Sequence, residues 1–102
     1  MKRVLILTAV LSLFVYAKEA QNGEAVFKKY CWGCHHQSAM AFGPPFTQIA
    51  SKRTPAQIKA YILSPKSMYK TFGYKRSVMT QLHLSRSELD AITRYIVSYK
   101  GK

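Results

Sequence analysis

Apolar residues recur at helical spacing in several parts of the chain, and no run shows the two-residue alternation of a strand. The first helix is expected over residues 22–30, with Asn22 as its N-cap and Glu24 in its first turn, where an acid interacts favourably with the helix dipole. This helix leads directly into Cys31. Further on, two prolines and a phenylalanine open a short turn over residues 44–50.

Two further helices have clear start or stop signals. Thr54-Pro55 is typical of an N-cap followed by proline at the first helical position, and Ser64-Pro65 ends that helix. The last helix begins at Ser85, three residues before Glu88, which is the spacing of a capping box. The apolar faces are Ile58, Tyr61 and Ile62 in one helix, and Leu89, Ile92, Ile96 and Tyr99 in the other. The pattern predicts an all-α fold.

Residues 64–84 contain turn signals but no convincing period. A structureless loop of that length is unusual inside a compact domain. This stretch is also less polar than a disordered linker; its apolar and aromatic residues are Met68, Tyr69, Phe72, Tyr74, Val78 and Met79. We therefore expect the loop, including Tyr74, to pack on a cofactor instead of on protein.

The first seventeen residues have the pattern of a secretory signal peptide. Two basic residues precede an apolar run over residues 4–16, and Ala17 ends a small-residue cleavage pattern. The run is shorter than the ~20 residues that a membrane-spanning helix needs. We expect cleavage after Ala17, or alternatively after Ala20. Residues 18–102 then form one exported, periplasmic domain with no stable insertion in the membrane.

A domain of this size has a marginal core, because it buries only roughly 60–65% of its unfolded surface. Small domains compensate with disulfides, metals or other cofactors. The chain has two cysteines, and a bridge between Cys31 and Cys34 would close too short a loop to stabilise the fold. We therefore expect a bulky ligand to complete the core.

Residues 31–35 read Cys-Trp-Gly-Cys-His, which is the C-x-x-C-H pattern that attaches c-type haem. In that chemistry each thiol adds to one vinyl group of the porphyrin, and the histidine supplies an axial nitrogen. The expected cofactor is one covalently attached haem c, whose iron is bound by His35. Two alternatives remain. A thioredoxin-like dithiol would need a strand–helix unit, and a zinc site using His35, His36 and His83 would need a second closely spaced ligand pair.

These residues together resemble the class I cytochromes c, especially the short bacterial members, over nearly the whole exported domain. Gly23 and Phe27 stand eight and four residues before the first haem cysteine. Ile92 and Tyr95 match the aliphatic and aromatic pair of the family's last helix, and Gly43-Pro44 resembles the Gly-Pro that follows the haem motif. The resemblance implies about four short helices wrapped round one haem.

The resemblance also implies roles for residues near the haem. The Pro44 carbonyl would accept a hydrogen bond from the ring of His35 and so orient this ligand. Phe46 and Ile49 would line the haem pocket.

The distal iron ligand implied by the resemblance is Met79, six residues before the Ser85 cap. Met68 is the second choice, and His83 or an open site are further alternatives. Many relatives have proline beside the ligand methionine, whereas this chain has Val78 and Thr80 there. We therefore expect a looser loop and a methionine–iron bond that is easier to displace.

Histidine and methionine ligation leaves iron without an open position, so we expect a one-electron carrier, or the cytochrome subunit of a redox complex, and not an enzyme. The alternative is a haem enzyme or sensor with a vacant or displaceable sixth site. A C-x-x-C thiol oxidoreductase is a weaker alternative.

The charge of the chain predicts the nature of its partners. Its formal net charge is +12, and loss of two basic residues with the signal peptide lowers it to +10. Residues 37–87 contain no acid. We expect an acidic redox protein to dock on a ring of Lys28, Lys29, Lys66, Lys70, Lys75 and Arg76, and we expect no nucleic-acid partner. The alternative is that these charges only maintain solubility.

Overall fold

The computed structural model describes residues 22–102, and the expected signal peptide over residues 1–17 lies outside them. Every regular element in the described part is a helix, which confirms the all-α prediction. The elements are α2 (Gly23–Val26), the π-helical turn η1 (Phe27–Cys31), α3 (Phe46–Lys52), α4 (Pro55–Leu63), α5 (Pro65–Met68) and α6 (Arg86–Val97). No helix in this part of the chain is both long and apolar enough to cross a bilayer.

Two of the three predicted N-caps are present. The Thr54 hydroxyl accepts a hydrogen bond from the Gln57 N–H, and the Gln57 side chain accepts one from the Thr54 N–H. Ser85 and Glu88 make the same reciprocal pair at the start of α6. The prediction for Asn22 is wrong, since its side chain makes no capping bond. Its φ of −98° and ψ of 49° lie outside the extended region typical of a cap.

Prolines determine where the middle helices begin. The turn expected after Pro44 is a complete helix, α3, which begins immediately after Pro45. Within the stretch that the sequence left without regular structure, Pro65 occupies the first position of the short helix α5. Proline suits this position because it has no N–H to leave unpaired. Pro65 therefore ends α4 and also starts α5, and it is fully buried.

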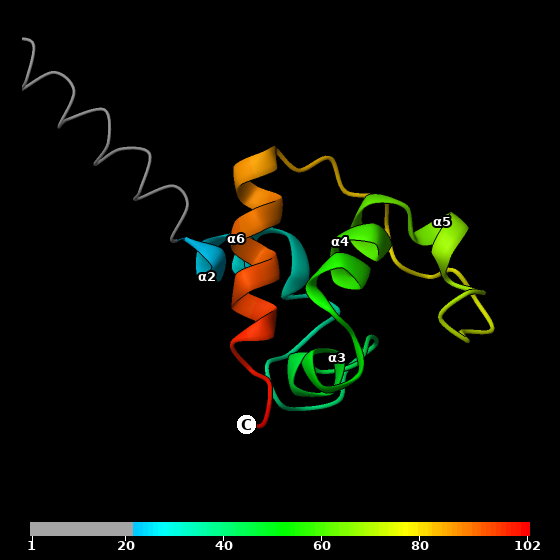
Figure 1. Cartoon of the computed structure of the whole chain (residues 1–102), viewed down its shortest axis with the longest axis horizontal. Coiled ribbons are helices and arrows are strands. Elements are labelled where there is room, and N and C mark those ends of the chain that lie inside the picture. The colour runs from blue at the N-terminus through cyan, green and yellow to red at the C-terminus, as the bar shows by residue number, and fades with distance from the viewer. Residues whose placement is uncertain (1–21) are drawn as a thin grey trace, which may run out of the picture.

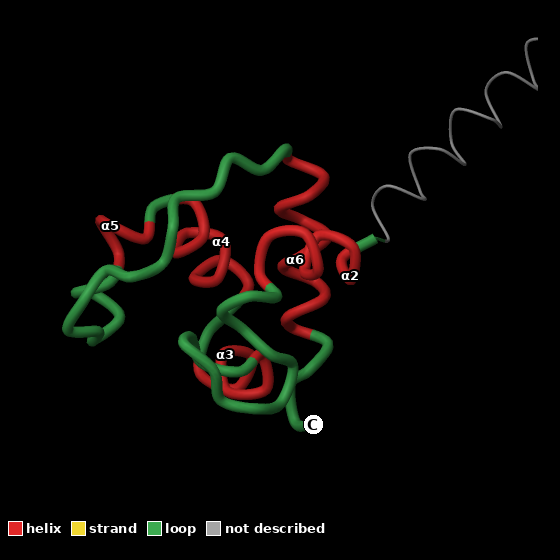
Figure 2. The backbone as a smooth tube through the Cα atoms, turned by 180° about the vertical axis from the view of Figure 1, so that it is seen from behind, coloured by secondary structure: helices red, strands yellow, loops and turns green. Residues whose placement is uncertain are grey.

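Helix α6 is the centre of the fold (Figures 1 and 2), where it crosses α2 and packs against α3 and α4. The crossing with α2 is close: a Cβ on Gly23 would lie 2.5 Å from the Ala91 carbonyl oxygen and 2.6 Å from the Tyr95 Cβ. The buried core between these helices consists of Val26, Phe27, Phe46, Ile58, Ile62, Ile92 and Ile96.

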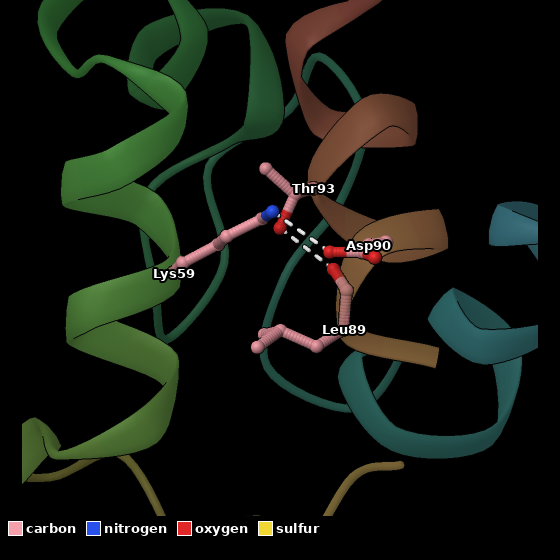
Figure 3. Close-up of polar contacts among 4 residues, drawn as sticks. All are labelled: Lys59, Leu89, Asp90 and Thr93. Carbon is pink, nitrogen blue, oxygen red and sulfur yellow. Dashed lines mark hydrogen bonds and ion pairs between the residues drawn. The ribbon is translucent and has the colours of Figure 1, made fainter. Parts of the chain in front are cut away.

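A polar contact fixes α4 beside α6 (Figure 3). Lys59 Nζ on α4 lies 2.7 Å from Asp90 Oδ1 on α6. The hydrogen bond from Lys59 lowers the pKa of the Asp90 carboxyl. One turn later, the buried Thr93 hydroxyl donates to the Leu89 carbonyl at 2.7 Å, so it remains paired inside the helix. Solvent screening limits the energy of the ion pair, and its main effect is to align the two helices.

Candidate functional site

The π-helical turn η1 brings both cysteines and His35 to one place. The Trp32 N–H donates to the Phe27 carbonyl at 2.9 Å, five residues back. The Cys31 carbonyl then accepts from the N–H groups of Cys34, at 3.1 Å, and His35, at 2.9 Å. π-Helical turns are frequent at functional sites. The turn over residues 31–35 that follows η1 directs both thiols and the imidazole into the wall of one cavity.

The two thiols are free and do not form a disulfide. Burial, together with the nearby Cys34 thiol, raises the pKa of Cys31 to about 11. A thiol redox centre needs the opposite shift, because the thiolate is its reactive form. The environment of Cys31 therefore disfavours the dithiol alternative. In residues 22–102, no three histidine, cysteine or acidic side chains are arranged to hold a metal ion.

The orientation of His35 is determined by Gly43, Pro44 and Phe46. Its Nδ1 lies 2.8 Å from the Pro44 carbonyl oxygen, which is the contact that the resemblance implied. Because a carbonyl can only accept, the proton of the neutral ring is on Nδ1, and the lone pair of Nε2 is left free to bind a metal. The ring also stacks on Phe46, with centroids 5.8 Å apart. A Cβ on Gly43 would lie 2.7 Å from Nδ1, so only glycine leaves room for the ring.

The cavity has a volume of about 420 Å³ and lies between η1, α3, α4, α6 and the stretch before α6. Its wall contains every residue proposed from the sequence as cofactor-binding and the first choice of distal ligand: Cys31, Cys34, His35, Pro44, Phe46, Ile49, Tyr74 and Met79. The alternatives Met68 and His83 are not among the lining residues.

Sequence reasoning missed several residues of the wall. Tyr61 had a usable signal, since it shares the apolar face of α4 with Ile58 and Ile62, and all three line the cavity. The sequence contains no signal that places Arg53 in the cavity wall, because a single cation at the end of a helix is typical of any solvated surface. Its guanidinium reaches the cavity by stacking on Phe72, a contact between residues nineteen positions apart in the chain.

The residues of this cavity fit a covalently attached haem. The volume is within the roughly 300–1,000 Å³ of cofactor pockets, and the lining is mostly apolar and aromatic. The two thiols can form the two thioether bonds. One imidazole and one thioether are a ligand pair that haem iron takes in cytochromes c.

Comparison with known proteins agrees with this fit. Residues 20–100 match the family described as cytochrome c. A cytochrome c from Rhodothermus marinus is 27% identical, with a TM-score of 0.64 over 82% of this chain and 81% of that one. An engineered cytochrome c from the same organism, bound to a carbene intermediate, is also 27% identical, with a TM-score of 0.63 over 80% of each chain. No curated protein sequence matches.

The family match covers almost all of the residues that the structure describes, and it includes the attachment motif and the cavity wall. The fold is the small helical one of the similar structures. This chain therefore belongs to the cytochrome c family, as a class I member with one covalently attached haem c.

Proposed function

We propose that this protein is a periplasmic one-electron carrier whose haem iron is held between His35 and Met79. Membership of the cytochrome c family establishes the coarser function, which is haem-based electron transfer. The finer assignment is supported by one observation about the cavity. Met79 lies in its wall together with His35, whereas Met40 and Met68, the other methionines of residues 22–102, do not.

Haem supplies an iron that gains and loses one electron, and a thioether ligand favours the reduced state. The chain's own residues hold and shield that group. The Pro44 carbonyl keeps the His35 ring in one tautomer, and Phe46 and Ile49 contribute to an apolar wall that limits access of water. If His35 and Met79 both bind the iron, no position would be left for a substrate, and the arrangement would suit electron transfer more than catalysis.

The experiment replaces Met79 and Met68 in turn by alanine in the haem-loaded protein. Met79→Ala is expected to abolish the near-infrared thioether–ferric charge-transfer band, lower the reduction potential and allow carbon monoxide to bind the reduced protein. Met68→Ala is the matched control and should retain the band. The opposite result would assign the ligand to Met68, and a band that survives both substitutions would contradict methionine ligation by this loop.

A haem enzyme or sensor with a displaceable sixth site is the second candidate. The backbone around Met79 supports it, because residues 75–84 make no backbone–backbone hydrogen bond. Binding of carbon monoxide to the unmodified reduced protein would favour this candidate over the carrier.

We also propose an acidic redox protein as the partner, either of a free carrier or of a cytochrome subunit in a complex. Three basic residues, Arg53, Lys75 and Arg76, lie in the wall of the cavity, and residues 37–87 contain no acid to neutralise them. A partner with acidic side chains round its own redox centre would match this charge. The proposed location in the periplasm is supported by the signal-peptide pattern of residues 1–17.

A further inference from the structure

The segment that contains Met79 lacks the usual means of holding a loop in place. Between Lys75 and Leu84 no backbone group makes a backbone–backbone hydrogen bond. The chain also has no proline after Pro65, so neither proline nor backbone hydrogen bonding restricts the segment, and its apolar side chains Met79, Leu82 and Leu84 pack on the core. A segment of this kind opens at low free-energy cost unless side chains hold it.

The first side-chain contact is on Phe72, seven residues before Met79. The Arg53 guanidinium, directly after α3, donates to the Phe72 carbonyl at 2.9 Å and lies 4.2 Å from the centre of the Phe72 ring. Tyr61 on α4 also packs against Phe72, with ring centroids 5.1 Å apart, and it contacts Tyr74 at 5.8 Å. Contacts from Tyr61 on α4 and from Arg53 at the end of α3 therefore fix the chain directly before the segment.

The second contact is on Gln81, two residues after Met79. Its Nε2 donates to the Leu63 carbonyl at 2.8 Å and also to the Leu82 carbonyl at 3.1 Å. Leu63 is the last residue of α4, where carbonyl groups have no partner within the helix. The Gln81 amide therefore satisfies a free helix carbonyl and ties the end of the segment to α4.

We propose that Arg53 and Gln81 are positioning residues that form a two-point clamp, Arg53 on Phe72 and Gln81 on Leu63, and thereby hold Met79 in the cavity wall. The clamp rests on the proposed ligand role of Met79. It takes the place of the missing backbone hydrogen bonds and of proline. Its strength sets how often Met79 leaves the iron and how readily an external ligand takes its position.

The test uses the haem-loaded ferric protein with imidazole as the external ligand. Arg53→Leu and Gln81→Leu keep side-chain bulk but remove the donors. Each is expected to increase the rate of imidazole binding by about tenfold, because each removes the hydrogen bond that ties its anchor point, and Arg53→Leu also removes a cation–π contact. Arg53→Lys keeps a donor and a charge and should restore part of the wild-type rate. Lys52→Leu, at the neighbouring exposed cation, should leave the rate unchanged.

Trypsin cleavage after Lys75 and Arg76, which lie inside the segment, provides a readout that does not depend on the iron. Cleavage there should accelerate in Arg53→Leu and Gln81→Leu, because cleavage of a segment follows how often it opens. If the wild-type protein has the thioether–ferric band but neither variant changes imidazole binding or cleavage, the clamp is wrong and Met79 ligation stands. If the wild type lacks the band, Met79 ligation fails, and unchanged cleavage would then overturn the clamp as well.

Discussion

At the scale of single residues, the proposed ligand role of His35 depends on two residues that hold its ring. The Pro44 carbonyl determines which ring nitrogen carries the proton. Gly43 provides the space, because its missing side chain is the place that the ring occupies. The Gly43 N–H also donates to the Cys34 carbonyl at 2.7 Å, which ties this residue back to the attachment motif.

Gly43→Ala tests this steric requirement. The added methyl group would lie 2.9 Å from His35 Nε2 and closer still to other ring atoms, so the ring or the backbone must shift. Overpacking of this kind costs roughly 1–3 kcal/mol of unfolding free energy. We expect that loss in denaturant titrations of the haem-loaded protein, together with a changed visible spectrum of the iron.

Gly33→Ala is the control for that substitution, because a Cβ there meets no atom within 4 Å and the residue lacks a positive φ. It should be nearly neutral. Equal stability losses in the two variants would show that the effect at residue 43 comes from the backbone of glycine and not from contact with His35.

At the scale of elements, the helices predicted correctly are those with complete local signals. Thr54 and Ser85 cap their helices through residues three positions away, and an interaction that short can be recognised in the sequence. Helix α5 and the missing cap at Asn22 were not predictable in this way. In both places the backbone conformation depends on packing against neighbouring segments, and tertiary packing overrides local propensity.

The capping box of α6 should make stability depend on pH. The hydrogen bond from the Ser85 N–H lowers the pKa of Glu88. A carboxyl with a depressed pKa contributes stability above its unfolded pKa of about 4.3, and this stability is lost as pH falls through the folded-state pKa. Unfolding free energy should therefore decline below about pH 4.3, and Glu88→Gln, which has no carboxyl, should decline less. Identical pH profiles would contradict this role of Glu88.

Ser85→Ala removes the other half of the capping box. We expect it to cost about 1 kcal/mol of unfolding free energy at neutral pH, measured by denaturant titration. Ser87→Ala is the matched control in the same turn, since Ser87 contacts Ser85 but accepts no backbone hydrogen bond at the helix start. A loss as large at residue 87 would contradict the capping role.

At the scale of the whole molecule, the cavity was predictable where it depends on motif spacing and not where it depends on packing. The cysteines and His35 follow from a five-residue pattern, and Pro44 and Met79 follow from the resemblance. The contributions of Arg53 and Gln81 are different, because each contacts a residue eighteen or nineteen positions away. Only the folded chain brings those pairs together.

The charges are also less uniform than the sequence suggested. Lys28 lies 3.2 Å from Glu24, and Lys29 is close enough to Glu88 to help lower its pKa. These two cations near the attachment motif are therefore partly neutralised. Lys75 and Arg76 belong to the cavity wall and have no acid nearby in sequence. Among the six residues expected to form a ring, Lys75 and Arg76 therefore keep more of their positive charge unbalanced than Lys28 and Lys29 do.

This asymmetry predicts which charges control docking. Electrostatic steering by an unpaired basic surface raises association rates by about 10- to 1,000-fold at low salt and weakens as ionic strength rises. With an acidic redox protein as partner, Lys75→Glu should reduce the rate of electron transfer at low salt most strongly. Lys28→Glu should have a smaller effect, because Glu24 already offsets that charge, and Lys102→Glu, at the chain end, should have the least. A rate independent of ionic strength, or equal effects of the three substitutions, would leave solubility as the role of these charges.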